Sequence, residues 1–108
     1  MMVNWSERAA LELADTAAYV TREFGRQAAV DMRNSIHEAV DDIAQFPMIG
    51  KACFSDDENG VEFRELACRL SSVIYAIYND EIYVVSIWNN RQNRNHLYKD
   101  LRQISKTM

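Results

Sequence analysis

The sequence has few of the residues that mark special classes of protein. Its 108 residues include two cysteines, three glycines and one proline. Cys53 and Cys68 lie 15 positions apart, which fits neither a CxxC pair nor the ligand spacing of a zinc site. We therefore expect two free, reduced thiols, as in a cytoplasmic protein, and we expect no metal ion and no other cofactor.

Long apolar runs and targeting segments are also missing. No stretch approaches the roughly 18 consecutive apolar residues that a membrane-spanning helix needs. The opening MMVNWSERAA lacks the basic start and apolar core of a signal peptide. Neither an internal repeat nor a low-complexity segment is present, so the sequence predicts one cytoplasmic domain over residues 1–108.

An excess of positive charge is absent as well. The formal net charge of −4 argues against a general nucleic-acid-binding protein, because such proteins gain affinity mainly by neutralising phosphates. The charge is uneven: residues 1–60 carry five Lys or Arg and eleven Asp or Glu, whereas residues 61–108 carry seven and five. Five of those seven cations fall within residues 91–108. Two interpretations remain open for them, a basic contact surface and the ordinary solvated face of a terminal helix.

Two amphipathic helices are expected in the first half of the chain. Ser6 is a suitable N-cap, and apolar residues then recur every three or four positions up to Phe24. Gly25 ends this helix. A second helical pattern starts near Arg26 and stops at Pro47. The short connection predicts an antiparallel helical hairpin, which must pack on an apolar sheet to be stable.

Strands are expected at the N-terminus and in the second half. Met2–Trp5 is short and apolar. Glu62–Ala67 is read as a strand whose two faces carry Phe63 and Glu65 on one side and Glu62, Arg64 and Leu66 on the other. Ser72–Gln92 contains two β-branched and aromatic strands with a tight turn at Asn79–Asp80. Lys51–Gly60 is read as a polar loop with an acidic cluster, whose carboxylates are interpreted as solvated rather than metal-binding.

The hairpin within Ser72–Gln92 is apolar on both faces. Strict alternation assigns the residues of its second strand to two faces, Ile82, Val84, Ser86 and Trp88 on one and Tyr83, Val85 and Ile87 on the other. The helical hairpin can cover only one face of the sheet. The other face requires either the C-terminal segment or a partner chain.

A short C-terminal helix is expected from Asn95 onward, with Leu97, Leu101 and Ile104 as its apolar stripe. Helices followed by consecutive strands indicate an α+β fold. The sequence therefore predicts an N-terminal strand and an antiparallel helical hairpin packed on an antiparallel β-sheet, with a short C-terminal helix.

Five segments carry a resemblance to a known family. They are VNWSERA (Val3–Ala9), FPMIGK (Phe46–Lys51), FRELA (Phe63–Ala67), VIYAIYNDEIYVVSIW (Val73–Trp88) and NRQ (Asn90–Gln92). On these segments the chain resembles the RelE/ParE superfamily of type II toxin–antitoxin toxins, also known as plasmid stabilisation proteins, and it is closer to the ParE-like branch. The resemblance implies a growth-regulating toxin neutralised by a cognate antitoxin protein, which becomes a candidate cover for the second apolar face.

The superfamily contains two mechanisms. RelE-like members cleave messenger RNA on the ribosome, which requires a general base, a proton donor and cations that hold the phosphate. On that alternative the catalytic candidates are Arg64, Glu65, Arg69, Arg91 and His96. Glu65 or His96 would act as base or acid, and the arginines would form the cationic clamp.

ParE-like members inhibit DNA gyrase by binding and need no catalytic group. The net charge of −4 favours this alternative, as does Asn89, an amide at a position near which many relatives carry a histidine. The resemblance then implies that Arg91, Gln92 and Arg94 form the target-binding surface. An ordinary polar sheet rim is the competing interpretation of these residues, and a non-toxic interaction domain is a third possibility for the whole chain.

Overall fold

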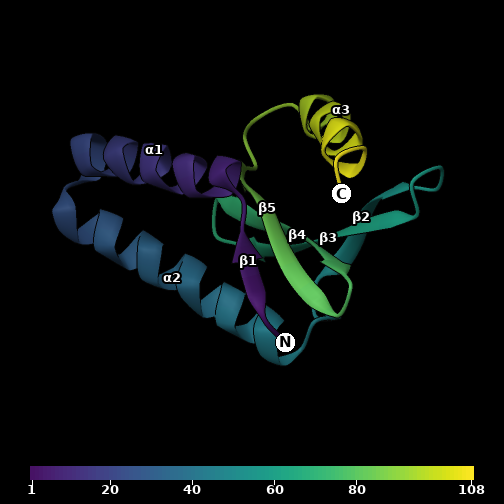
Figure 1. The fold of residues 1–108 in the computed structure, drawn as a ribbon. Helices are drawn as coiled ribbons and strands as arrows, with labels where there is room; N and C mark the ends of the chain where they lie inside the picture. Colours follow the sequence, from purple (N-terminus) through teal and green to yellow (C-terminus); the bar gives the residue numbers. More distant parts are fainter.

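A computed structural model describes residues 1–108 as a five-stranded sheet between two layers of helix (Figure 1). The helices are α1 (Glu7–Phe24), α2 (Arg26–Gln45) and α3 (Arg94–Ser105). The strands are β1 (Val3–Trp5), β2 (Lys51–Asp56), β3 (Val61–Cys68), β4 (Ser71–Tyr78) and β5 (Glu81–Asn89). The predicted α+β class, helical hairpin and C-terminal helix are all confirmed. None of the three helices combines the length and the apolar character needed to cross a membrane.

The sheet has the strand order β1-β5-β4-β3-β2. Strands β2 to β5 form consecutive antiparallel pairs, as predicted for the sheet. Strand β1 adds a parallel edge, with Val3 opposite Ile82 and Trp5 opposite Val84. A parallel neighbour requires a long connection, and here both long helices and three strands lie between β1 and β5 in the sequence.

The two faces of the sheet carry separate apolar clusters. On one face, residues such as Val73, Tyr75 and Ile82 pack with Leu13 and Ile36 of the α1–α2 hairpin. The opposite face belongs to a second cluster under α3. Its strand residues are Val61, Phe63, Ile74, Ala76, Val85 and Trp88, and its helix residues are Leu97 and Leu101. The C-terminal helix, rather than a partner chain, therefore covers the second apolar face (Figure 1).

The loop predicted for Lys51–Gly60 is wrong, because β2 occupies its first six residues. This strand lies at the sheet edge and its residues are exposed or only partly buried, so its apolar signal is weak. A register shift between Ala52 and Phe54 leaves Cys53 without a partner on β3 and further obscures the alternation. The acidic cluster begins where the strand ends, and Asp56 accepts hydrogen bonds from the backbone and side chain of Asn59.

The strict alternation predicted for the second hairpin strand is also wrong beyond Val85. Opposite β4, Tyr75 pairs with Val84 while Ile74 pairs with Ser86, so Val85 has no partner. This β-bulge adds one residue and reverses the faces of all later residues. Ile87 consequently packs under the helical hairpin, and Trp88 packs under α3.

Candidate functional site

Two cavities open on either side of the rim where β5 ends. The first, here called the helix-side groove, has a volume of about 230 Å³ and lies between the α1–α2 hairpin and the β3–β4 turn. Its lining includes Tyr19, Phe24, Met32, Leu70, Arg69 and Arg91. The second, here called the α3-side cleft, measures about 370 Å³. Its lining includes Ile49, Lys51, Glu65, Ser72, Asn90 and Arg94.

The β5 bulge governs which rim residues reach which cavity. Because it reverses the alternation, Asn89 lies on the helix side and lines the helix-side groove with Arg91. Asn90 lines the α3-side cleft. The turn after β5 is fixed by the Asn89 side chain, whose Oδ1 accepts a hydrogen bond from the backbone N–H of Arg91 at 2.9 Å. Adjacent polar residues are thus divided between two separate surfaces.

The Glu65 carboxylate in the α3-side cleft is paired within the chain. Arg94 donates two hydrogen bonds to the Glu65 carboxylate, from Nη1 at 3.0 Å and from Nη2 at 2.7 Å. Asn90 Oδ1 accepts from Arg94 Nη2 at 3.2 Å and from Ser72 Oγ at 3.1 Å. Lys51 Nζ lies 3.9 Å from the same carboxylate. A bidentate guanidinium–carboxylate pair is a strong contact, and here it ties the first turn of α3 to β3.

The ionisation of groups near this cleft follows from that pairing and from burial. The hydrogen bonds to Glu65 raise the pKa of Arg94 above its ordinary value. Cys53, half-buried on β2, has its pKa raised to about 11 by desolvation and then by the nearby Glu65 charge. The Cys53 thiol is therefore neutral at pH 7.

The helix-side groove has the opposite character. Phe24 is 70% exposed and Leu70 is 61% exposed, which is unusual for side chains of this size. Arg69 occupies the left-handed region of the backbone at φ 58, in the turn that carries Leu70. Arg69 and Arg91 are both exposed, and the ion pairs of the chain involve other cations. An open apolar groove flanked by two available guanidiniums is suited to binding an acidic, partly apolar segment.

Both terminal nitrogens of Arg64 are engaged by contacts within the chain. Its Nη1 donates to the Gly50 carbonyl at 2.7 Å, and its Nη2 lies 2.9 Å from Glu62 Oε1. The buried Tyr75 hydroxyl holds the same turn, since it donates to the Pro47 carbonyl at 2.7 Å and accepts from Gly50 N–H at 2.9 Å. A Cβ at Gly50 would lie 2.6 Å from that hydroxyl, so the position requires glycine. Arg64 and Tyr75 together fix the connection from α2 to β2.

The structure separates the residues proposed for RNA cleavage. Glu65 lies on the α3 side of the sheet and is engaged by Arg94, whereas Arg69 and Arg91 line the groove on the helix side. His96 is exposed in the first turn of α3 and lines neither cavity. Of the residues proposed to bind a target, Arg91 and Gln92 are exposed, but Arg94 is partly buried and paired.

Sequence reasoning missed the apolar walls of the groove. Phe24 was assigned to the apolar stripe of the first helix, yet Phe24 and Tyr19 are both exposed near the C-terminal end of that helix. Leu70 in the β3–β4 turn was the available signal, because a large apolar residue in a tight polar turn has nothing in its own hairpin to cover it. Ser86 was a comparable signal for the bulge, as a polar residue within an apolar strand.

Comparisons with known proteins agree with this architecture. The family model described as the ParE toxin of the type II toxin–antitoxin system, parDE, matches residues 3–94. Among solved structures, the chromosomal ParDE TA system from P. aeruginosa superimposes with a TM-score of 0.68 and 21% identity, over 82% of this chain and 95% of that chain. At this identity the likeness shows a shared fold. A search of curated proteins found no match. Because the family model spans most of the sequence and confirms the resemblance noted above, the chain belongs to the ParE toxin family of type II toxin–antitoxin systems.

Proposed function

We propose that this chain is a cytoplasmic toxin that stops growth by binding and inhibiting DNA gyrase, and that a cognate antitoxin protein neutralises it. The main support is the contrast in how the rim arginines are used. Arg91 is exposed beside the helix-side groove, whereas Arg94 in the α3-side cleft is tied to Glu65 by two hydrogen bonds. This arrangement provides a contact surface and leaves no assembled acid–base pair.

The proposed contact surface consists of Arg91 and Gln92, with Arg69 at the opposite edge of the groove. Arg94 contributes indirectly on this proposal, because its guanidinium holds α3 and the rim through Glu65 and Asn90. The gyrase segment would place carboxylates on the arginines and apolar side chains against Phe24 and Leu70. An antitoxin that covers the same residues would prevent the contact by exclusion.

Ribosome-dependent RNA cleavage is the second candidate function. The observation that favours it is the presence of Lys51, Glu65 and Arg94 in one open cleft. The Tyr98 side chain also contributes to the raised pKa of Arg94. A general base must be able to accept a proton. Glu65 instead accepts both hydrogen bonds from Arg94 and is only 6% exposed, which favours the binding function.

The test is induced expression of the chain, with gyrase supercoiling and ribosome-bound messenger cleavage measured on the same preparations. We expect supercoiling to be inhibited and messenger RNA to remain intact. Arg91→Ala should weaken inhibition about tenfold or more, because one charged contact at an interface is worth about 1.4 kcal/mol or more. Arg33→Ala, which removes an exposed arginine of α2 outside both cavities, is the matched control.

If the chain cleaves messenger RNA and Glu65→Gln or His96→Ala abolishes that cleavage, the gyrase proposal is wrong and the nuclease function takes its place. A chain that neither slows growth nor inhibits either target would instead support a non-toxic interaction domain. Rescue of growth by co-expression of a small protein encoded beside the toxin gene is the expected sign of the antitoxin.

A further inference from the structure

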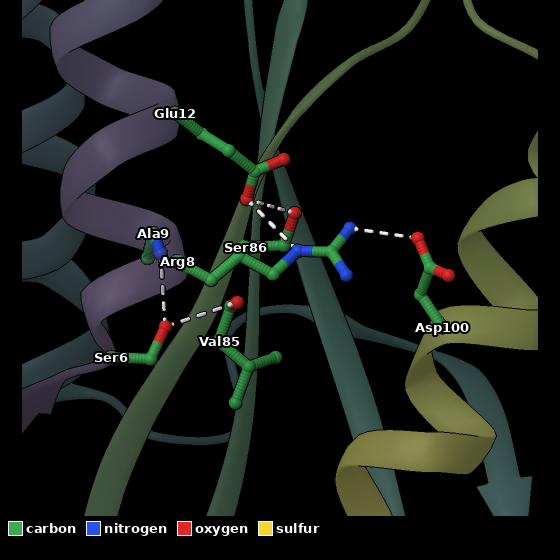
Figure 2. Close-up of polar contacts among 7 residues, drawn as sticks. All are labelled: Ser6, Arg8, Ala9, Glu12, Val85, Ser86 and Asp100. Carbon is green, nitrogen blue, oxygen red and sulfur yellow. Dashed lines mark hydrogen bonds and ion pairs between the residues drawn. The ribbon is translucent and has the colours of Figure 1, made fainter.

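Ser6 holds two elements at once, the start of α1 and the bulge of β5. Its Oγ accepts a hydrogen bond from Ala9 N–H at 2.9 Å, which caps the helix, and donates to the Val85 carbonyl at 3.2 Å (Figure 2). Its backbone N–H also donates to the Val84 carbonyl at 2.9 Å. The parallel pairing of β1 with β5 ends at Val84. Ser6 therefore binds β5 where the regular ladder stops and the bulged residue begins.

A second set of contacts holds the other side of the bulge. Ser86, completely buried, donates from Oγ to Glu12 Oε1 at 2.9 Å. Arg8 Nε donates to the same oxygen at 3.3 Å, and Arg8 Nη2 reaches Asp100 Oδ2 on α3 at 3.1 Å. Figure 2 shows this chain of contacts running from α1 across β5 to α3. Ser6 at the N-cap and Glu12 in the second turn of α1 thus hold Val85 and Ser86, respectively.

The bulge has a consequence at the rim. A one-residue change in strand register moves every later side chain to the opposite face. With the bulge, Asn89 and Arg91 line the helix-side groove and Asn90 lines the α3-side cleft. Without it, continued alternation would place Trp88 under the hairpin and would exchange the sides of the rim residues. The bulge at Val85 thus sets the side of Asn89, the last residue of β5, and the Asn89 side chain in turn holds the backbone N–H of Arg91.

We propose that Ser6 is a positioning residue for the target-binding surface: its hydroxyl holds the Val85 bulge and thereby directs Arg91 into the helix-side groove. Ser86 and Glu12 support the same bulge from its other side. The inference rests on the proposed function only where Arg91 is said to contact gyrase. The geometric part, that Ser6 determines the side on which residue 91 lies, stands apart from the identity of the target.

Three substitutions separate this role from ordinary helix capping. Ser6→Thr keeps a hydroxyl that can both cap α1 and donate to Val85. Ser6→Asp keeps a strong N-cap acceptor for Ala9 N–H. It cannot donate a hydrogen bond to Val85, and its negative carboxylate would be repelled by the Val85 carbonyl oxygen. Ser6→Ala removes both contacts. A residue that merely caps the helix would tolerate Asp, whereas a residue that holds the bulge would not.

The first readout is geometric and uses the native thiol in the groove. Cys68 and Arg91 line the same cavity, so Arg91→Cys in a Cys53→Ser background should be joined to Cys68 by a short bifunctional thiol reagent. Asn90→Cys, which opens on the α3-side cleft, is the matched control and should cross-link poorly. We expect Ser6→Asp to reduce the Arg91→Cys cross-link several-fold and to raise that of Asn90→Cys, whereas Ser6→Thr leaves both unchanged.

The second readout is gyrase affinity, measured with Arg91 in place. Ser6→Asp should weaken binding about tenfold, while circular dichroism shows an unchanged helix content and Ser6→Thr binds like the parent. A Ser6→Asp variant that cross-links and binds like the parent would overturn the proposal, even if Ser6→Ala fails to fold. If the parent does not bind gyrase, the proposed function fails, and the cross-linking pattern still decides the role of Ser6.

Discussion

On the α3 side of the sheet, Arg94 gives both terminal nitrogens to Glu65, whereas on the helix side Arg69 and Arg91 extend into solvent beside exposed Phe24 and Leu70. The two surfaces share one rim and differ in what covers them. Helix α3 buries Leu97 and Leu101 on its face and adds an ion pair. The α1–α2 connection projects beyond the sheet (Figure 1). Phe24, at its start, lines the groove and is exposed.

This difference indicates how the fold divides stability from recognition. Buried apolar contacts and paired charges stabilise the chain itself, while an exposed apolar surface with unpaired cations stabilises it little and is typical of an interaction site. Substitutions on the two sides should therefore have different effects. Those on the α3 side should lower the free energy of unfolding, and those in the groove should weaken binding to a partner.

The largest expected effect is the loss of apolar burial under α3. Leu101→Ala should lower the free energy of unfolding by about 2–5 kcal/mol, because Leu101 is completely buried and its removal leaves a cavity. Leu70→Ala, in the groove, should change it by no more than about 0.5 kcal/mol. Urea unfolding of both variants provides the measurement. Equal destabilisation would show that the groove is part of the core.

The next effect concerns the two arginines of the rim. Arg94→Ala leaves the Glu65 carboxylate buried, with Lys51 at 3.9 Å as its remaining cation. Breaking a buried pair costs about 3–5 kcal/mol, and we expect about 2 kcal/mol here because solvent reaches Arg94, which is 35% exposed. Arg91→Ala should change stability by less than about 0.5 kcal/mol. Urea unfolding of both variants provides the measurement, and an equal loss of stability in Arg91→Ala and Arg94→Ala would contradict the difference between the two sides.

Most of this architecture could be read from the sequence because its signals are local. Ser6, Gly25 and Pro47 mark helix ends through capping and backbone geometry, and the hairpin turn at Asn79–Asp80 has the positive φ values that such turns require. Strand β2 was missed because an edge strand is only partly buried and its Cys53 bulge interrupts the alternation. The pattern of residues along one strand does not show the hydrogen-bond register that a neighbouring strand imposes on it.

The candidate site was less predictable for the same reason. The residues Arg91, Gln92 and Arg94 were predicted together as one target-binding surface, yet the Val85 bulge and the Glu65 pairing give them different surroundings. A bulge depends on tertiary contacts, here from Ser6 and Glu12, that lie more than 70 positions away in the chain. Alternation along β5 alone could not reveal it.

A smaller effect is expected in thiol chemistry, which reports on both sides in one experiment. Burial raises the pKa of Cys53 from the ordinary 9.0 to about 11, so at pH 8 its thiolate population is about 100-fold lower than that of an unperturbed thiol. Burial also raises the pKa of Cys68, but this thiol lines the open groove. Alkylation at pH 8 followed by peptide mass spectrometry should modify Cys68 first. A partner bound in the groove should protect Cys68 and leave the Cys53 rate unchanged.

The smallest effect is a pH dependence confined to the far end of α3. Asp56 accepts hydrogen bonds from Ser105 and Asn59, and these lower the pKa of its carboxyl below the unfolded value. The stabilisation is therefore complete above about pH 4, the ordinary range of an aspartate, and is lost as pH falls through the lower folded value. The protection factor at the last turn of α3, which allows for the slower chemical exchange of amides in acid, should fall as pH is lowered, and Asp56→Asn should remove that dependence. An equal fall in the protection factor at the α1–α2 connection would contradict the assignment, because the contacts of Asp56 are to Asn59 and Ser105.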